Sequence, residues 1–331
     1  MPKVSVIVPC YNEEKTIGLL LEAIFCQSFP RTDIEVVIAD GLSTDRTRQV
    51  IADFQRSHAE MAILMVDNLR KTIPSALNSS IQASRGEYIV RLDAHSVPAL
   101  DYVARCVAAL DSGIGENVGG VWQIEPGGKG WIASSIAAAA AHPLGVGDAL
   151  YRFTSRAGRV DTVPFGAFRR SLIDKIGYYD ETLLTNEDYE FNARVREAGG
   201  IVWLDPAIRS VYFARPNLAA LARQYFRYGF WKYRMLKRYP GTLRWRQALP
   251  PVFLLSLIVL ALFSIFWSQA RMGLVVEAGL YTSILLVAGL RLAQQRKDAR
   301  YIIGIPLAIA AMHLTWGIGF LVSVVESLLN T

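Results

Sequence analysis

The sequence predicts an α/β fold with a mainly parallel sheet, followed by helices that cross a membrane. Over roughly the first two hundred residues, short apolar segments alternate with stretches of helical length, which is the pattern of βαβ units. Acidic residues stand at or just after the ends of several of these apolar segments. The last ~80 residues are mostly apolar, in runs long enough to cross a bilayer.

Strands are expected where short apolar runs are bounded by turn residues, at residues 4–8, 35–39, 61–66 and 88–92. The helices between these strands are expected at residues 13–27, 43–55 and 72–84. Ser43 is placed to cap the second of these helices. A further helix at about residues 99–110, a strand at 118–124, a loop at 127–130 and an apolar stretch at 132–141 follow. Asn186 is a candidate N-cap for a later helix, whose first turn then holds two acids, where the helix dipole favours negative charge.

Three apolar segments near residues 249–268, 272–290 and 301–328 approach or exceed the ~20 residues that span a bilayer. Basic residues flank them on one side, before the first segment and between the second and third, where Arg291, Arg296, Lys297 and Arg300 lie. By the positive-inside rule, the N-terminal part is cytoplasmic and the C-terminus lies outside. The sequence thus predicts a multi-pass protein of the inner cell membrane.

These patterns predict three parts of the chain. We expect a cytoplasmic catalytic domain at residues 1–215, a basic aromatic interfacial segment at 216–248, and a membrane domain with three transmembrane helices at 249–331. The net charge of +6 is concentrated in residues 223–246, which contain no acid. Aromatic residues interleaved with that charge could stack on nucleic acid, but a segment facing anionic lipid explains them better because apolar spans follow directly. We therefore expect membrane lipid and no nucleic acid as a partner.

The three cysteines have no metal-site spacing and are expected to be reduced and buried.

Acidic residues at the strand ends are the candidates for chemistry. Glu13 follows the first strand, Asp40 ends the second and Asp93 follows the fourth. The carboxyl ends of neighbouring parallel strands meet at one edge of the sheet, where ligands bind. Each acid alone is as readily a turn former as a functional group, but their joint placement favours a site. Asp188, at the start of a later helix, is a further candidate.

The ordered motifs resemble those of family 2 glycosyltransferases over about residues 3–230. VSVIVPCYNEE at residues 4–14 is similar to the opening of that family, and DGLSTDRT at 40–47 to its second nucleotide-binding motif. Asp93-Ala94-His95 stands where the family carries Asp-x-Asp, and Glu187-Asp188 resembles its late Glu-Asp pair. QYFRY at 224–228 resembles a relaxed Gln-x-x-Arg-Trp motif. The triplet and the membrane tail look most like the succinoglycan-biosynthesis glucosyltransferase branch.

The resemblance implies a GT-A fold and an inverting transferase that uses a nucleotide-diphosphate sugar, usually UDP-linked. The acceptor would be a lipid-linked or polysaccharide glycan at the cytoplasmic membrane face, in exopolysaccharide or glycolipid synthesis. Asp188, beside Glu187, would be the general base. Donor-binding positions would be Pro9, Tyr11, Glu13, Asp40 and Asp93, with Gln224 and Arg227 near the diphosphate or acceptor. Asp93 and His95 would hold a divalent metal.

His95 departs from the family pattern, in which an aspartate fills this position. Mg²⁺ prefers oxygen ligands and imidazole suits transition metals, so the histidine favours Mn²⁺ over Mg²⁺. Alternatively, a protonated His95 would hydrogen-bond the diphosphate directly. Two other functions stay open on sequence. A sugar-phosphate nucleotidyltransferase would need a glycine-rich basic loop that residues 9–14 lack, and a non-catalytic membrane scaffold would need no base, although Asp188 is retained.

Overall fold

The computed structural model describes residues 1–329, and the chain divides into two compact units. The first unit combines Met1–Gln123 with Leu150–Tyr212, and the second combines Ile124–Ala149 with the chain from Phe213 onward. Both units are therefore discontinuous in sequence. The predicted α/β fold with a mainly parallel sheet, followed by long apolar helices, is confirmed.

The sheet begins with four parallel strands in the spatial order β3-β2-β1-β4. Their bounds are β1 (Val4–Cys10), β2 (Ile34–Asp40), β3 (Ala62–Asp67) and β4 (Tyr88–Arg91). Antiparallel strands extend the sheet beyond β4: β8 (Ala167–Arg169), β6 (Asn117–Pro126), β9 (Val202–Ala214) and β5 (Ser96–Pro98), with β7 (Gly158–Arg159) paired to β9. The β1–β2 register ends with Cys10 opposite Asp40, so both strands deliver the chain to the same edge.

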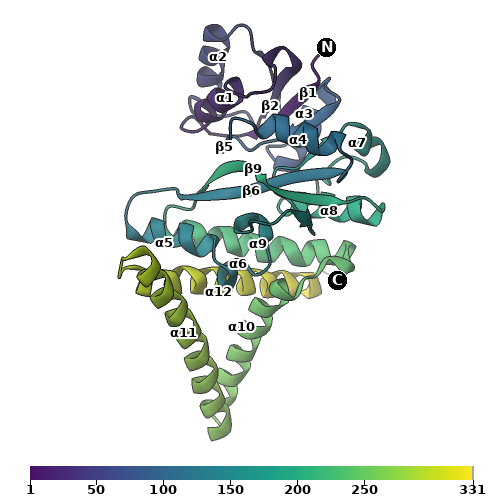
Figure 1. Cartoon of the computed structure of the whole chain (residues 1–331). Helices are drawn as coiled ribbons and strands as arrows, with labels where there is room; N and C mark the ends of the chain where they lie inside the picture. The colour runs from purple at the N-terminus through teal and green to yellow at the C-terminus, as the bar shows by residue number, and fades with distance from the viewer. Residues whose placement is uncertain (330–331) are drawn as a thin grey trace. The chain divides into compact units, whose positions relative to one another are not determined.

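Helices cover the two faces of this sheet because successive strand side chains point to opposite sides. Val6 belongs to one apolar core and its neighbour Ile7 to the other. The first core includes side chains from α1 (Ile17–Phe25), α2 (Thr47–Ser57) and α4 (Tyr102–Asp111). The second includes side chains from α3 (Ile73–Ala83), α7 (Ser171–Ile176) and α8 (Glu187–Glu197). Figure 1 shows α1 and α2 beside β1 and β2.

Two local predictions in this unit are wrong, and a third is confirmed only in its position. Ser43 does not cap a helix, because α2 begins only at Thr47 and the Ser43 hydroxyl donates to the Asp40 carboxylate at 2.5 Å. Asn186 is the N-cap residue of α8, and Glu187 and Asp188 lie in its first turn as predicted, but the Asn186 side chain makes no capping hydrogen bond. Cys26 is exposed, whereas Cys10 and Cys106 are buried as expected. Burial raises the pKa of both buried thiols, which keeps them protonated.

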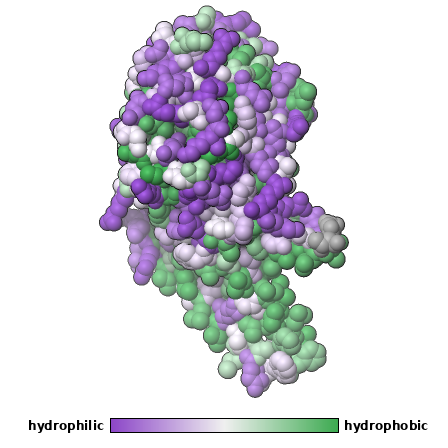
Figure 2. All heavy atoms as spheres, turned by 90° about the vertical axis from the view of Figure 1, so that its right-hand side faces the viewer, coloured by the Kyte–Doolittle hydropathy of each residue, from purple (hydrophilic) through white to green (hydrophobic). Residues whose placement is uncertain are grey.

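The second unit is helical. It contains α5 (Trp131–Ala140), α6 (Pro143–Val146), α9 (Leu218–Arg238), α10 (Trp245–Phe263), α11 (Ser268–Arg296) and α12 (Tyr301–Leu329). The last three are long and apolar enough to cross a membrane. Within this unit, α10 and α11 spread apart from a shared tip, while α5, α9 and α12 lie alongside one another (Figure 1). Apolar side chains cover the surface of the α10–α11 hairpin (Figure 2).

Candidate active site

The loops that follow β1 and β2 are locked together by hydrogen bonds. Asn12 has a φ of 55°, a left-handed conformation that asparagine tolerates better than most residues. Its backbone N–H donates to the Ser43 hydroxyl at 2.8 Å, and its side-chain oxygen accepts from the backbone N–H of Thr44 at 2.8 Å. The Glu13 N–H donates to the Thr47 hydroxyl at 2.7 Å. These hydrogen bonds hold the two loops together at the edge of the sheet where the candidate residues lie.

Asp40 lies at the centre of this edge and is fully buried. Its carboxylate accepts hydrogen bonds from the Ser43 N–H at 3.0 Å and from the Arg48 guanidinium at 2.5 Å. A second ion pair joins Arg48 to Asp67, at the end of β3. The structure thus places Asp40 where the sequence predicted, but its oxygens are engaged by neighbouring residues.

Tyr11 and Pro9 complete the β1 side of the edge. The Tyr11 ring is half exposed and packs over Gly41, where a β-carbon would stand 3.0 Å from the ring. The Lys71 ammonium lies 5.9 Å from the centre of the same ring. Pro9 pairs with Ala39 within the parallel ladder. An exposed aromatic ring held in this way offers a flat surface on which a nucleotide base can stack.

Glu13 and His95 link the end of β1 to the loop after β4. The Glu13 carboxylate lies 3.2 Å from Nδ1 of His95, and its other oxygen accepts from the Thr16 hydroxyl at 2.5 Å. Burial would raise the pKa of Glu13, but these two hydrogen bonds outweigh it and hold the pKa below its ordinary value. Both side chains are about a quarter to a third exposed, at 26% and 31%. They therefore face an open side of the unit.

Arg91 gathers the remaining acids. Its guanidinium is buried and lies 3.2 Å from Asp93 and 3.0 Å from Glu187, and it forms an ion pair with Asp188. Burial would lower the pKa of Arg91, but the charges of Asp93 and Glu187 raise it above its ordinary value. The strand-end acid and the acids of α8 thus share one cation. Asp188 is the most exposed of these three carboxylates, at 30%.

Arg91 is not among the residues predicted from the sequence, although a signal was present. Arg91 is a charged residue at the end of the apolar strand β4, directly before the apolar Leu92. Arginine is almost never fully buried unless it is paired, so its position in a central strand predicts nearby carboxylates. Arg48 was missed as well, and its spacing of eight residues from Asp40 gave no comparable signal.

The residues predicted to bind a metal at this site are Asp93 and His95. Within residues 1–329, no three His, Cys, Asp or Glu side chains are grouped as a metal site. Asp93 and His95 would hold a cation together with oxygens of a bound phosphate or of water. The Glu13 contact to Nδ1 of His95 fits this role, because metal-binding histidines usually donate their second ring nitrogen to a carboxylate, which turns Nε2 toward the metal.

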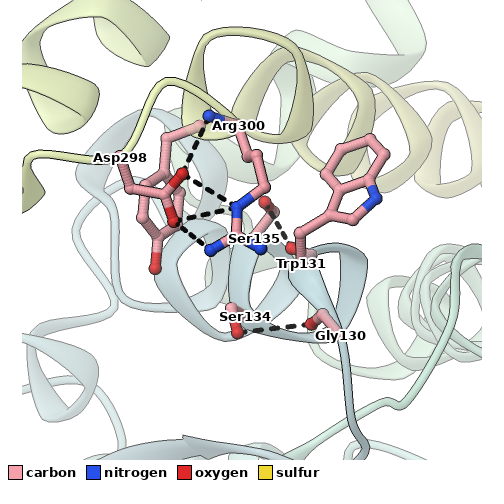
Figure 3. Close-up of a pocket in the computed structure, with 7 residues that line it drawn as sticks. Gly130, Trp131, Ser134, Ser135, Asp298 and Arg300 are labelled. Atoms are coloured by element: carbon pink, nitrogen blue, oxygen red, sulfur yellow. Dashed lines mark hydrogen bonds and ion pairs between the residues drawn. The ribbon is translucent and has the colours of Figure 1, made fainter.

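Two of the predicted site residues lie in the second unit. Gln224 and Arg227 are on α9, where the Gln224 amide donates to the Tyr228 hydroxyl at 2.9 Å. A polar pocket of about 250 Å³ also lies in this unit (Figure 3). None of the predicted site residues lines this pocket. Its lining comes from the start of α5 and the turn into α12: Gly130, Trp131, Ser134, Ser135, Asp298, Arg300 and Tyr301.

Comparison with known proteins identifies relatives over nearly the whole chain. The family described as Glycosyl transferase family 2 matches residues 5–177, more than half of the chain. The chain is 29% identical over 326 residues to the succinoglycan biosynthesis protein ExoA of Rhizobium meliloti (strain 1021), covering 95% of this chain and 93% of that protein. It is 26% identical over 324 residues to a Methanococcus voltae dolichyl N-acetyl-alpha-D-glucosaminyl phosphate 3-beta-D-2,3-diacetamido-2,3-dideoxy-beta-D-glucuronosyltransferase, covering 96% and 95% of the two chains.

Solved structures share the fold. The mannosyltransferase PcManGT from Pyrobaculum calidifontis, in complex with GDP-Man and Mn²⁺, has a TM-score of 0.63 and 21% identity, covering 94% of this chain and 87% of its own. TarS 1–349 of S. aureus in complex with UDP-GlcNAc has a TM-score of 0.51 and 17% identity, covering 93% and 91%. At these identities, the likeness describes the fold.

Proposed function

The chain belongs to glycosyl transferase family 2, and from this premise we propose that it transfers a sugar from a nucleotide-diphosphate sugar to a lipid-linked or polysaccharide acceptor at a membrane. The observation that carries the proposal is the convergence of Asp93, Glu187 and Asp188 on Arg91 beside the strand-end loops. The GT-A fold and the glycosyltransferase activity follow from the family. The donor, its metal and the acceptor are the parts proposed here.

The donor is proposed to be UDP-linked and to bind across the ends of β1, β2 and β4. Tyr11 would stack on the base, and Pro9 and Glu13 would contact the donor at the same edge of the sheet. Asp40 is buried and hydrogen-bonded to Ser43 and Arg48, so it would hold the loop that meets the ribose. The relatives supply the chemical class, since TarS was solved with UDP-GlcNAc and PcManGT with GDP-Man.

A divalent cation, Mn²⁺ in preference to Mg²⁺, is proposed to bind Asp93 and His95 together with the donor diphosphate. When bound, such a cation neutralises charge on the leaving phosphate oxygens. Glu13 would orient the His95 ring through the 3.2 Å contact to Nδ1. Gln224 and Arg227 are proposed to meet the diphosphate or the acceptor, where Arg227 would supply a charge-assisted hydrogen bond.

Asp188 is proposed as the general base, with Glu187 beside it. The acceptor hydroxyl gives its proton to Asp188 as its oxygen attacks the anomeric carbon. The bond from that carbon to the diphosphate breaks, and the nucleoside diphosphate leaves on the opposite face, so the configuration inverts. A positioned base contributes a factor of roughly 10²–10⁴ to the rate. Arg91 holds the Asp188 carboxylate in place through their ion pair.

The acceptor is proposed to reach the site from the cytoplasmic membrane face. Basic residues lie at the end of α9 and between α11 and α12, which supports a cytoplasmic position for these segments by the positive-inside rule. The apolar surface of α10 and α11 would anchor the protein in the inner membrane (Figure 2). A lipid-linked glycan in that leaflet would then be within reach of a membrane-held enzyme.

The decisive experiment separates chemistry from donor binding. Asp188→Asn should abolish sugar transfer. The affinity for the nucleotide sugar, measured by thermal stabilisation, should stay within about threefold of wild type. Asp174→Asn, at an exposed position on α7, is the matched control and should leave both unchanged. Full transfer activity in Asp188→Asn would refute the assignment of the base. A panel of UDP- and GDP-sugars, each with Mn²⁺, with Mg²⁺ and with EDTA, identifies the donor and the metal.

A further inference from the structure

The helix α12 is the third of the apolar helices, yet it packs against the most basic helix of the chain. Its most extensive contacts are with α9, which carries Arg223, Arg227, Lys232, Arg234, Lys237 and Arg238. The two helices approach closely at glycines. A β-carbon at Gly319 would overlap the Phe226 carbonyl, and one at Gly229 would overlap the Trp316 carbonyl. This packing ties α12 to the level of α9 in the second unit.

Polar contacts fix the C-terminal end of α12 to the C-terminal end of α9. Arg234 pairs with Glu326 at 2.8 Å, and the Lys237 ammonium donates to the Ser327 hydroxyl at 2.6 Å. The end of α12 must therefore lie at the same depth relative to the membrane as Arg234 and Lys237.

The end of α9 leads directly into the start of α10. The buried Lys232 ammonium donates to the Thr242 carbonyl at 3.1 Å, which folds the short turn Pro240–Thr242 back onto α9. The Trp316 indole N–H of α12 donates to the Gln247 carbonyl, in the first turn of α10, at 3.2 Å. The C-terminal half of α12 thus lies where α10 begins.

The start of α12 lies on that same side. The helices α10 and α11 form an antiparallel hairpin, because the Ser256 hydroxyl donates to the Glu277 carboxylate at 2.5 Å and the Phe253 and Tyr281 ring centres are 4.5 Å apart. At about 1.5 Å per residue, α10 spans about 28 Å, close to the ~30 Å thickness of the hydrocarbon core, and α11 returns. The polar turn after α11, with Asp298 and Arg300 paired at 2.8 Å, then opens α12 beside α5 (Figure 3).

Both ends of α12 are therefore on the side from which α10 enters the membrane. We propose that α12 is not a membrane span but lies along the membrane surface, so that of the three long apolar helices only α10 and α11 cross and the end of α12 stays on the entry side. This inference rests on the proposed membrane anchoring and revises the expectation of three spans with an external C-terminus. Length and apolarity alone admit α12 as a span, but its partners do not.

The outward face of α12 fits the acyl chains of the bilayer. Its exposed apolar side chains fall within an arc of about 120° at 100° per residue: Ile303, Leu307, Ile318, Val322, Val325, Leu328 and Leu329. Buried residues such as Ile309 and Met312 lie on the opposite side, toward the other helices. This stripe belongs to the same unit as the lipid-facing surface of the α10–α11 hairpin, so membrane lipid is the occupant to which the proposal commits.

Cysteine labelling in the full-length chain tests the arrangement independently of transfer activity. The exposed native thiol is first removed by Cys26→Ser. In that background, one variant carries a cysteine appended after Thr331, and a second carries Ser268→Cys at the tip of the α10–α11 hairpin. A membrane-impermeant maleimide is applied to intact cells and to inside-out vesicles.

The appended cysteine should label in inside-out vesicles and not in intact cells, with at least a tenfold difference, and Ser268→Cys should show the reverse. Labelling of the appended cysteine from outside would establish three spans and overturn the proposal. Failure of Ser268→Cys to label from outside would show that the hairpin does not cross, which also overturns it. Loss of sugar transfer with the expected labelling pattern would refute the proposed function alone.

Discussion

The buried guanidinium of Arg91 is ion-paired with the carboxylate of Asp188, so a side chain from the end of β4 holds one from the first turn of α8. Asp93 and Glu187 share the same cation. The relative positions of the strand-end acid and the proposed base therefore depend on one residue. Four predictions concern this cluster, the Glu13–His95 contact and the packing of the second unit.

Removing Arg91 should both destabilise the protein and stop transfer. Arg91→Gln leaves three carboxylates without their shared cation, and breaking a buried ion pair in this way costs about 3–5 kcal/mol. Arg91→Lys keeps the charge but loses the forked geometry, so it should recover part of the stability while kcat stays low. Thermal unfolding in detergent and initial rates measure the two effects. Arg105→Gln breaks an exposed pair with Asp101 and should cost at most about 1 kcal/mol; equal losses in both variants would contradict the role of Arg91.

Glu13 should stabilise the protein in a pH-dependent manner. Its pKa is lowered in the folded state, so its contribution is complete above the ordinary glutamate pKa of about 4.3 and is lost as pH falls through the folded value. Glu13→Gln should cost about 1 kcal/mol at pH 7 and progressively less below about pH 4. Unfolding temperatures at a series of pH values show this convergence. Glu22→Gln, at an exposed position on α1, should leave the profile unchanged; a constant Glu13→Gln deficit down to pH 3 would disagree with the lowered pKa.

His95 should set the metal preference. His95→Asp replaces an imidazole with an oxygen ligand and should raise activation by Mg²⁺ relative to Mn²⁺. Glu13→Gln, which removes the carboxylate that orients the ring, should weaken Mn²⁺ affinity by about 10–100-fold. Metal titrations of the EDTA-treated enzyme measure both. Unchanged activity of wild type in EDTA would remove the metal from the proposal and leave His95 as a direct phosphate contact.

The close packing of α9 against α12 should make Gly319 intolerant of a methyl group. A β-carbon there would overlap the Phe226 carbonyl, and overpacking of this kind costs about 1–3 kcal/mol. Gly279→Ala, on α11 with nothing within 4 Å of the added atom, is the matched control. It should be neutral or gain up to about 1 kcal/mol from helix propensity. Thermal unfolding compares the two, and equal stability would argue against the contact.

The sequence predicted the parallel strands and the edge where their acids meet, because the pattern of apolar residues is local and the carboxyl ends of neighbouring parallel strands share one edge. It did not predict the pairing of Arg91 with Glu187 and Asp188, since that contact joins segments separated by an antiparallel extension of the sheet. Ser43 was misassigned because a capping serine and a serine bound to Asp40 look alike in sequence. Hydropathy likewise records the composition of α12 but not its partners.

The discontinuity of the second unit has a consequence for synthesis. The helix α5 is synthesised before residues 141–300, yet its partner α12 is the last helix of the chain. Gly304 of α12 fits against Ser135 of α5, where a β-carbon would find no room. Until α12 has been made, α5 lacks the helix with which it makes its most extensive contacts. A chain shortened before α9 would lack that helix permanently, so a soluble catalytic fragment calls for excision of residues 124–149 as well as the C-terminal helices.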